Sequence, residues 1–146
     1  MPDSTLHQRL LPLYPMLREL PPAQLHTLLA AGTMRLPAGT LVFRENQACM
    51  GFPLILRGSI RVIKAAPTGR ERQLYRVGPG ESCILSSSCL LGHSSYHARG
   101  VAEQEVELLV LPAAVFRSWL AEHESFRDYI FSLFSERLTD LMQLVS

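Results

Sequence analysis

Two cysteines, Cys83 and Cys89, enclose a short serine-rich segment, and a third cysteine, Cys49, lies upstream. Cys83 follows Glu81 by two residues at the expected first turn of a helix. The positive end of the helix dipole there favours the thiolate, which is the reactive form of cysteine. A sensor of oxidants or of sulfur species requires such a thiolate. Cys83, Cys89 and Cys49 are therefore candidates for redox chemistry.

The same cysteines can be structural. The carboxylate of Glu81 opposes thiolate formation, and a free cysteine behaves as a small apolar residue that is commonly buried. A six-residue separation along a continuous helix is awkward for a disulfide, because the two Cα atoms must come within about 7 Å. For Cys83 and Cys89 both interpretations stay open, whereas for Cys49 we favour a structural role.

A metal or haem site is a further alternative in the same segment. Cys89, His93 and His97 recur every four residues and are suitable ligands for zinc or haem iron. Gly92 interrupts the run, and no close C-x-x-C pair accompanies it, so we expect no metal and no cofactor. We also expect ordinary surface positions for the remaining histidines, His7, His26 and His123.

The sequence carries no recognisable catalytic set. The serines at 86–88 lack the context of a nucleophile elbow, and no phosphate-cradling Walker motif occurs. Glu103, Glu105 and Glu107 alternate along an expected strand, which predicts a solvent-facing stripe. We therefore expect a protein that is not an enzyme.

Composition limits the class of protein that positions these residues. Apolar residues make up 47% and charged residues 18% of the 146, which is typical of one globular domain. No apolar stretch is long enough to cross a bilayer and no secretory signal is evident, so we expect a cytoplasmic protein with reduced thiols. The net charge is +1 with dispersed basic residues, and this chain alone is not expected to hold DNA.

Periodicity divides the chain into three parts. Residues 1–32 have leucines at three- and four-residue spacing, and Gly32 is expected to end the second helix. Residues 33–112 contain short β-prone runs separated by Gly and Pro, which predicts a jelly roll, or double-stranded β-helix, in a mainly β fold with flanking helices. The expected strands are Thr33–Leu36, Thr40–Arg44, Phe52–Leu56, Ser59–Ala65, Arg72–Val77 and Val101–Leu111.

Residues 113–146 are expected to form helices that include a long dimerisation helix. Its apolar side is too wide for one small sandwich, which favours a homodimer over simple packing on its own roll. Leu133 and Met142 are also placed to reach the roll. The expected interface residues are Phe126, Ile130, Leu133, Phe134, Leu138, Leu141 and Val145. The helix reaches Ser146 without a Gly or Pro stop signal, so we expect it to continue in a longer protein.

The glycines fit a known family. The stretch LPAGTLVFRENQACMGFPLILRGSIRVIKAAPTGRERQLYRVGPGESC resembles the cyclic-nucleotide-binding signature of CRP/FNR transcription regulators. The resemblance implies a β-roll that holds an effector beside a dimerisation helix, and a C-terminal helix-turn-helix that this chain lacks. DNA would then be bound only through that missing domain.

In nucleotide-binding members of that family, a Gly-Glu pair opens a short helix that faces the cyclic phosphate, and a later Arg binds the phosphate. Gly80 and Glu81 match the pair, but Tyr96 or His97 stands at the place of the arginine before Ala98. A displaced Arg99 rarely reproduces a bidentate clamp. We therefore expect no binding of cyclic AMP.

The segment GESCILSSSCLLG resembles a subgroup of these regulators with cysteines at this place. The predicted effector cassette spans about 78–99, and its effector is an unknown small molecule. Our leading hypothesis is a thiol, redox or sulfur-species sensor; the alternatives are a small anionic ligand or cyclic nucleotide at Glu81, and a dimer scaffold without any ligand. The predicted effector-binding residues are Gly80, Glu81, Ser82, Cys83, Ser88, Cys89, Tyr96, His97 and Arg99.

Overall fold

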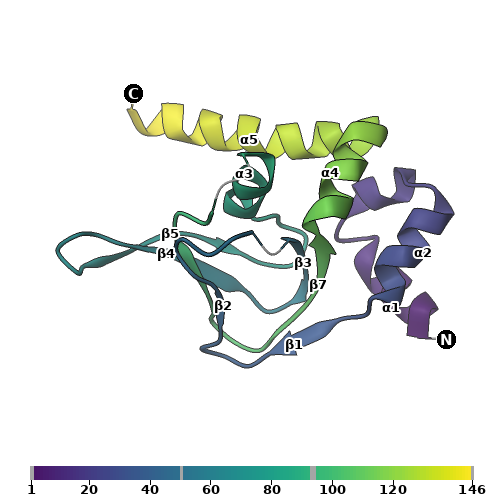
Figure 1. The fold of residues 1–146 in the computed structure, drawn as a ribbon, viewed down its shortest axis with the longest axis horizontal. Coiled ribbons are helices and arrows are strands. Elements are labelled where there is room, and N and C mark those ends of the chain that lie inside the picture. Colours follow the sequence, from purple (N-terminus) through teal and green to yellow (C-terminus); the bar gives the residue numbers. More distant parts are fainter. Residues whose placement is uncertain (1, 50, 93–94, 146) are drawn as a thin grey trace.

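The protein consists of two antiparallel sheets with helices at both ends of the chain (Figure 1). The computed structural model describes residues 2–49, 51–92 and 95–145. The helices are α1 (Pro2–Leu10), the 3-10 helix η1 (Pro15–Glu19), α2 (Pro22–Ala30), α3 (Ile84–Gly92), α4 (Ala113–Glu122) and α5 (Glu124–Val145). The strands are β1 (Met34–Leu36), β2 (Leu41–Phe43), β3 (Gly51–Arg57), β4 (Ile60–Ala65), β5 (Glu71–Val77), β6 (Arg99–Ala102) and β7 (Val106–Pro112).

The strand order shows how the roll is wound. One sheet has the order β1-β7-β3 and the other has the order β2-β6-β4-β5, so most neighbours within a sheet are distant in sequence. Strand β7 pairs with β1 and β3, whereas the preceding strand β6 pairs with β2 and β4. The predicted fold class is confirmed: a mainly β roll with flanking helices and a long C-terminal helix.

The expected strand Val101–Leu111 is in fact two strands in different sheets. The chain bends between β6 and β7, where Gly58 packs against it: a Cβ on Gly58 would lie 2.3 Å from the carbonyl oxygen of Glu105. The expected solvent-facing glutamate stripe is also wrong, because Glu107 is 3% exposed and binds Arg9. The bend changes the alternation of faces on which that expectation depended.

Two groups of buried side chains hold the layers together. The first joins the helices to β3 and β7 and centres on aromatic rings: Phe126 makes edge contacts with Phe116, Trp119 and Phe52 at 5.5–6.3 Å between centroids. The second fills the inside of the roll and includes Cys83, Cys89 and Tyr96. Helix α3 therefore lies between the roll and the C-terminal helices.

The N-terminal helices are fixed to the roll by polar contacts. The Tyr14 hydroxyl donates to the carbonyl of Ile55 (2.9 Å) and approaches that of Glu81 (3.2 Å), and burial raises the pKa of Tyr14. Arg9 on α1 makes two hydrogen bonds to Glu107, at 2.6 and 3.1 Å. These bonds connect the start of the chain to the sheet β1-β7-β3 and to the predicted cassette.

Helix α5 divides into a packed half and an exposed half. Phe126 and Ile130 were expected at the dimer interface. Instead they are at most 1% exposed and belong to the chain's own core, so neither is available to a partner. Leu133 and Phe134 are half-buried against the same core. Beyond them Met142, expected to reach the roll, is instead exposed. The large apolar residues exposed along the helix are Phe131, Leu138, Leu141, Met142 and Leu144. The side chain of Val145 lies outside the described residues.

Across residues 2–49, 51–92 and 95–145, no helix has the length and apolar character needed to span a membrane.

Candidate functional site

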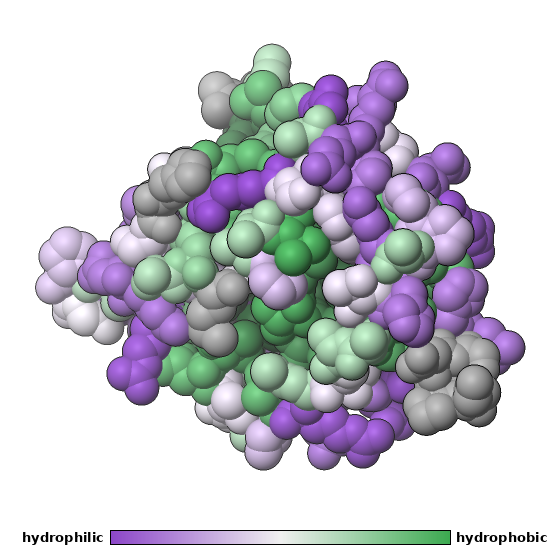
Figure 2. Space-filling view, turned by 45° about the vertical axis from the view of Figure 1, so that its right-hand side comes forward, coloured by the Kyte–Doolittle hydropathy of each residue, from purple (hydrophilic) through white to green (hydrophobic). Residues whose placement is uncertain are grey.

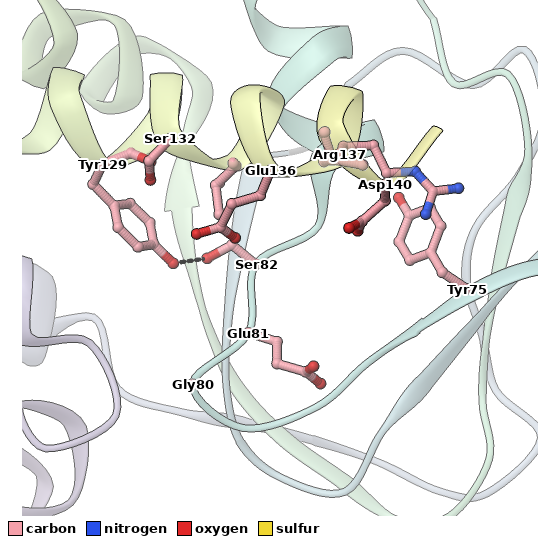
Figure 3. Close-up of a pocket in the computed structure, with 11 residues that line it drawn as sticks. Tyr75, Gly80, Glu81, Ser82, Tyr129, Ser132, Glu136, Arg137 and Asp140 are labelled. Atoms are coloured by element: carbon pink, nitrogen blue, oxygen red, sulfur yellow. Dashed lines mark hydrogen bonds between the residues drawn. The ribbon is translucent and has the colours of Figure 1, made fainter. Parts of the chain in front are cut away.

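The predicted cassette begins with a tight loop that is tied to α5. Glu81 Oε1 accepts a hydrogen bond from the backbone N–H of Gly78 (2.8 Å), and Gly80 adopts the left-handed conformation (φ +78°) that closes the turn. The next residue, Ser82, makes a hydroxyl–hydroxyl hydrogen bond with Tyr129 of α5 (Figure 3). The loop therefore contacts the long helix directly.

A cavity of about 420 Å³ lies between this loop, β5 and α5. Glu136 and Asp140 point from α5 toward the loop (Figure 3), and Glu81 adds a third carboxylate. Arg137, whose guanidinium lies 5.7 Å from the centroid of the Tyr75 ring, is the one cation among the lining residues. The lining thus carries a net negative charge, which is unfavourable for an anionic ligand.

Cys83 caps helix α3 from inside the roll. It immediately precedes the helix, as expected, and its Sγ accepts a hydrogen bond from the Ser86 N–H (3.4 Å) and lies 3.5 Å from the Tyr75 hydroxyl. Its side chain is 2% exposed. A small molecule outside the protein would reach this sulfur only after the cassette opens.

Cys49 and Cys89 form a disulfide that joins the loop before β3 to α3. Their Cα atoms are 6.1 Å apart, within the range that a disulfide requires. The expectation of reduced thiols is therefore wrong for these two residues. Chain spacing could not reveal the pair, because 40 residues separate them and only the winding of the roll brings them together.

Tyr96, one of the two residues expected at the place of the family's arginine, is buried inside the roll. Tyr96 is 2% exposed and stacks on Phe43, with centroids 4.4 Å apart. The cavity beside the two rings measures only about 30 Å³, whereas ligand pockets usually measure roughly 300 Å³ or more. Ser86 also lines it, and the Ser86 hydroxyl has no hydrogen-bond partner in the described part of the chain. This cavity, among the described residues, is too small for a nucleotide.

The remaining predicted cassette residues lie elsewhere. Ser88 and His97 are exposed, and the His97 backbone carbonyl accepts a hydrogen bond from Lys64 Nζ (2.6 Å). Arg99 pairs with Glu71 at 2.6 Å, a bond that lowers the pKa of that glutamate. Within the described residues no three His, Cys, Asp or Glu side chains are grouped as metal ligands would be, and His93 lies outside those residues.

Of the nine predicted effector-binding residues, the structure brings Gly80, Glu81 and Ser82 to the large cavity. Sequence reasoning missed the opposite wall. Its signal is a polar stripe on α5 at three- and four-residue spacing, which puts side chains on one face of a helix. The stripe consists of Tyr129, Ser132, Glu136 and Asp140.

The comparisons with known proteins agree with the observed fold. The model of the cyclic nucleotide-binding domain family matches residues 33–123. Lysophospholipase nte1 of Aspergillus fumigatus is 25% identical over 124 residues, and that of Aspergillus niger is 26% identical. Each match covers 85% of this chain, which spans about 8% of the length of these curated relatives.

Solved structures share the whole arrangement. The sensor domain of the transcriptional regulator DNR from Pseudomonas aeruginosa has a TM-score of 0.78 at 21% identity, covering 98% of this chain and 95% of that one. The Thermus thermophilus catabolite activator protein has a TM-score of 0.74 at 23% identity, covering 90% and 61%. A protein from Eubacterium rectale assigned to the crp/fnr family of transcriptional regulators has a TM-score of 0.75 at 26% identity, covering 92% and 62%.

Proposed function

Because the chain belongs to the cyclic nucleotide-binding domain family, we propose that it is the effector-sensing domain of a bacterial transcription regulator of the CRP/FNR type. The similarity to the DNR sensor domain supports this proposal, since it includes the helices at both ends as well as the roll. Related domains also occur in fungal lysophospholipases, so the fold alone does not define an activity. We assign no enzymatic activity to this domain.

The signal that we propose is the redox state of Cys49 and Cys89. The single observation that carries it is their disulfide, which joins the cassette helix to the roll. In the cytoplasm, where we place such a regulator, disulfides are rare and usually transient or redox-sensing. Cys83, our first candidate from sequence, becomes a structural cap in this proposal because it is buried and outside the bond.

The chemistry of the proposed switch is a two-electron exchange. A dithiol reductant breaks the Cys49–Cys89 bond, supplies two electrons and two protons, and becomes a disulfide itself, so that each cysteine sulfur becomes a thiol. Hydrogen peroxide reverses the change by taking the two electrons and two protons and leaving as two molecules of water.

Contacts of α3 provide a route to the C-terminal helices. Arg117 of α4 donates through Nε to the carbonyl of Leu90, the residue after Cys89, at 3.3 Å. Leu90 is fully buried among the aromatic rings of α4 and α5. Loss of the disulfide is expected to loosen α3 and, through these contacts, to change the balance between two arrangements of α4 and α5.

Hydrogen exchange of the oxidised and dithiol-reduced domain tests this proposal. Thiol titration under denaturing conditions should find Cys83 alone in the oxidised protein and all three cysteines after reduction. Reduction should raise amide exchange in 84–92 about tenfold and also raise it in α4, because a cross-link that restrains this helix is removed. Peroxide should restore the oxidised pattern.

Serine variants distinguish the roles of the three cysteines. Cys49→Ser and Cys89→Ser should each show the reduced pattern permanently, whereas Cys83→Ser should keep the response to dithiol. Unchanged exchange in α4 and α5 on reduction would contradict a redox signal. It would then favour a dimer scaffold, provided that ligand screening also finds nothing.

The alternative of a small anionic ligand or cyclic nucleotide at Glu81 has less support. Its arguments are the Gly80-Glu81 match and the cavity beside it; against it stand three carboxylates and the Tyr96 ring inside the roll. Calorimetric titration with cyclic AMP is expected to show no binding to either redox state. Binding abolished by Glu81→Gln would establish the alternative instead.

We also propose that the chain acts as a homodimer through the exposed half of α5. DNA would be contacted only by a separate DNA-binding domain, and no membrane partner is proposed.

A further inference from the structure

A second cavity, of about 200 Å³, lies at the junction of α2, β7 and α4. Its walls come from Leu28 on α2, Ala31 directly after that helix, Leu111 on β7, and Val115 and Trp119 on α4. The view toward the N-terminal helices shows hydrophobic side chains visible between hydrophilic ones (Figure 2). Seven of the nine lining residues are apolar and none is charged.

Size and lining together define the chemistry that this cavity accepts. A dry cavity of roughly 150 Å³ lined by aliphatic and aromatic side chains can bind benzene. About 200 Å³ therefore accommodates one aromatic ring with a small substituent. A charged group would lose its hydration without meeting an opposite charge, because none of the lining residues is charged, so we expect a neutral occupant.

The cavity also offers hydrogen-bond donors that the described chain does not use. Trp119 lines the cavity, and its indole N–H donates to none of the described residues although it is not one of their buried unsatisfied polar atoms. An accessible N–H donates to water, and the acceptor atom of a ligand can replace that water. The carboxamide oxygen of Gln24, at the polar edge, lies 2.6 Å from His123 Nε2, which leaves the Gln24 amide N–H groups as further donors. A ligand with one acceptor oxygen fits this combination.

We propose that this cavity is a binding site for a small, neutral, single-ring molecule that carries an acceptor oxygen. The site stands apart from the redox proposal, since none of its residues lies in the cassette. Its position gives occupancy a consequence: Trp119 packs edge-on against Phe126 of α5, and His123, between α4 and α5, is the partner of Gln24. A bound ring would stiffen the joint between α2, α4 and α5.

Fluorine NMR with three probes of similar size tests the chemistry. Para-fluoroacetophenone has the ring and the acceptor oxygen, para-fluorocumene replaces the carbonyl by an apolar group, and para-fluorobenzoate carries a charge. We expect saturable binding of the ketone at sub-millimolar concentration, at least threefold weaker binding of the cumene, and no binding of the benzoate. Trp119 is the single tryptophan of the chain, so its fluorescence should change at the same ketone concentrations.

Two neighbouring alanines supply a matched pair of variants. Ala31 lines the cavity and Ala30 does not, and both are exposed residues at the end of α2, so either can be enlarged without disturbing the core. Ala31→Phe should weaken ketone binding at least tenfold by filling the cavity, whereas Ala30→Phe should leave it unchanged. Cys49→Ser should also bind normally, which separates this site from the redox proposal.

The opposite results are equally clear. No saturable binding of any probe to the wild-type protein would overturn the proposal. Equal binding to the two alanine variants would place the probe elsewhere and would also overturn it. Binding of the benzoate as tight as that of the ketone would contradict the assigned ligand chemistry.

Discussion

Two adjacent buried serines in α3 differ in their hydrogen bonding, and this difference should affect the stability of the protein. Ser86 and Ser87 are both fully buried, but Ser87 Oγ donates to the Cys83 carbonyl (3.2 Å), whereas the Ser86 hydroxyl has no described partner. An unsatisfied buried hydroxyl costs about 1–3 kcal/mol, and a satisfied one contributes about 1 kcal/mol. The two residues therefore act on stability with opposite sign.

We predict that Ser86→Ala raises the free energy of unfolding by about 1 kcal/mol, while Ser87→Ala lowers it by a similar amount. Alanine brings the same gain in helix propensity at both positions, so the difference between the variants reports the hydrogen bond. Urea denaturation followed by circular dichroism measures both. Equal shifts would mean that Ser86 has a partner after all.

The Arg9–Glu107 pair predicts a pH dependence of stability. The two hydrogen bonds from Arg9 lower the pKa of Glu107, which is nearly buried, below its ordinary value of 4.5. A lowered folded-state pKa contributes stability that is present above pH 4.5 and is lost as the pH falls through the folded value. Arg9 is 40% exposed, so solvent screens part of the interaction.

Glu107→Gln should therefore lower the free energy of unfolding by about 1–2 kcal/mol at pH 7, and this difference should shrink as the pH falls below 4.5. Chemical denaturation at several pH values measures it. Glu71→Gln is the control: Glu71 is 54% exposed in its pair with Arg99, so solvent screens the pair and the variant should unfold at nearly the same denaturant concentration as the wild type. A difference independent of pH would show that the charge of Glu107 contributes nothing.

At the scale of elements, two glycines with the same left-handed backbone conformation differ in what surrounds them. Gly58 has φ +81° and lies against the backbone at Glu105, whereas Gly69, at the tip of the β4–β5 hairpin, has φ +88° with open space around it. Both positions carry the left-handed penalty of about 1–2 kcal/mol for any other residue. Only Gly58 adds a backbone collision.

We predict that Gly69→Ala costs about 1 kcal/mol and Gly58→Ala at least 3 kcal/mol. Thermal unfolding of the two variants checks this. Similar losses would mean that the bend between β6 and β7 can move away from position 58 at little cost.

Sequence periodicity predicted most of the elements, because apolar spacing and glycine placement act locally. It could not place the break between β6 and β7, since that bend depends on Gly58, which contacts Glu105 only after the sheets are wound. The Cys49–Cys89 bond and the α5 wall of the cavity beside the cassette loop also depend on contacts between distant parts of the chain, so the sequence pattern could not predict them. The Gly80-Glu81 turn, in contrast, is local and lies where the family pattern puts it. Whether it binds an effector stays a prediction.

At the scale of the whole molecule, α5 connects the proposed sensor to a proposed partner. Its first half closes the core around Phe126, and its polar stripe faces the cassette loop. The exposed residues Phe131, Leu138 and Leu141, together with half-buried Phe134, follow alternating three- and four-residue steps. Such spacing is typical of helices that pair through a coiled-coil seam. Phe131, absent from our expected interface, takes the place that buried Phe126 and Ile130 cannot fill.

We predict that Leu138→Glu converts a dimer into a monomer that stays folded, because the side chain is 59% exposed in the protomer. A charge in an apolar seam would lose its hydration on pairing, which costs several kcal/mol. Sedimentation velocity over a range of concentrations measures the change. Leu74→Glu is the matched control: Leu74 is 38% exposed on β5 and is not one of the seam residues of α5, and its variant should remain dimeric. If Leu138→Glu stays dimeric as well, the partner must bind a different face, and the link from cassette to dimer through α5 would fail with it.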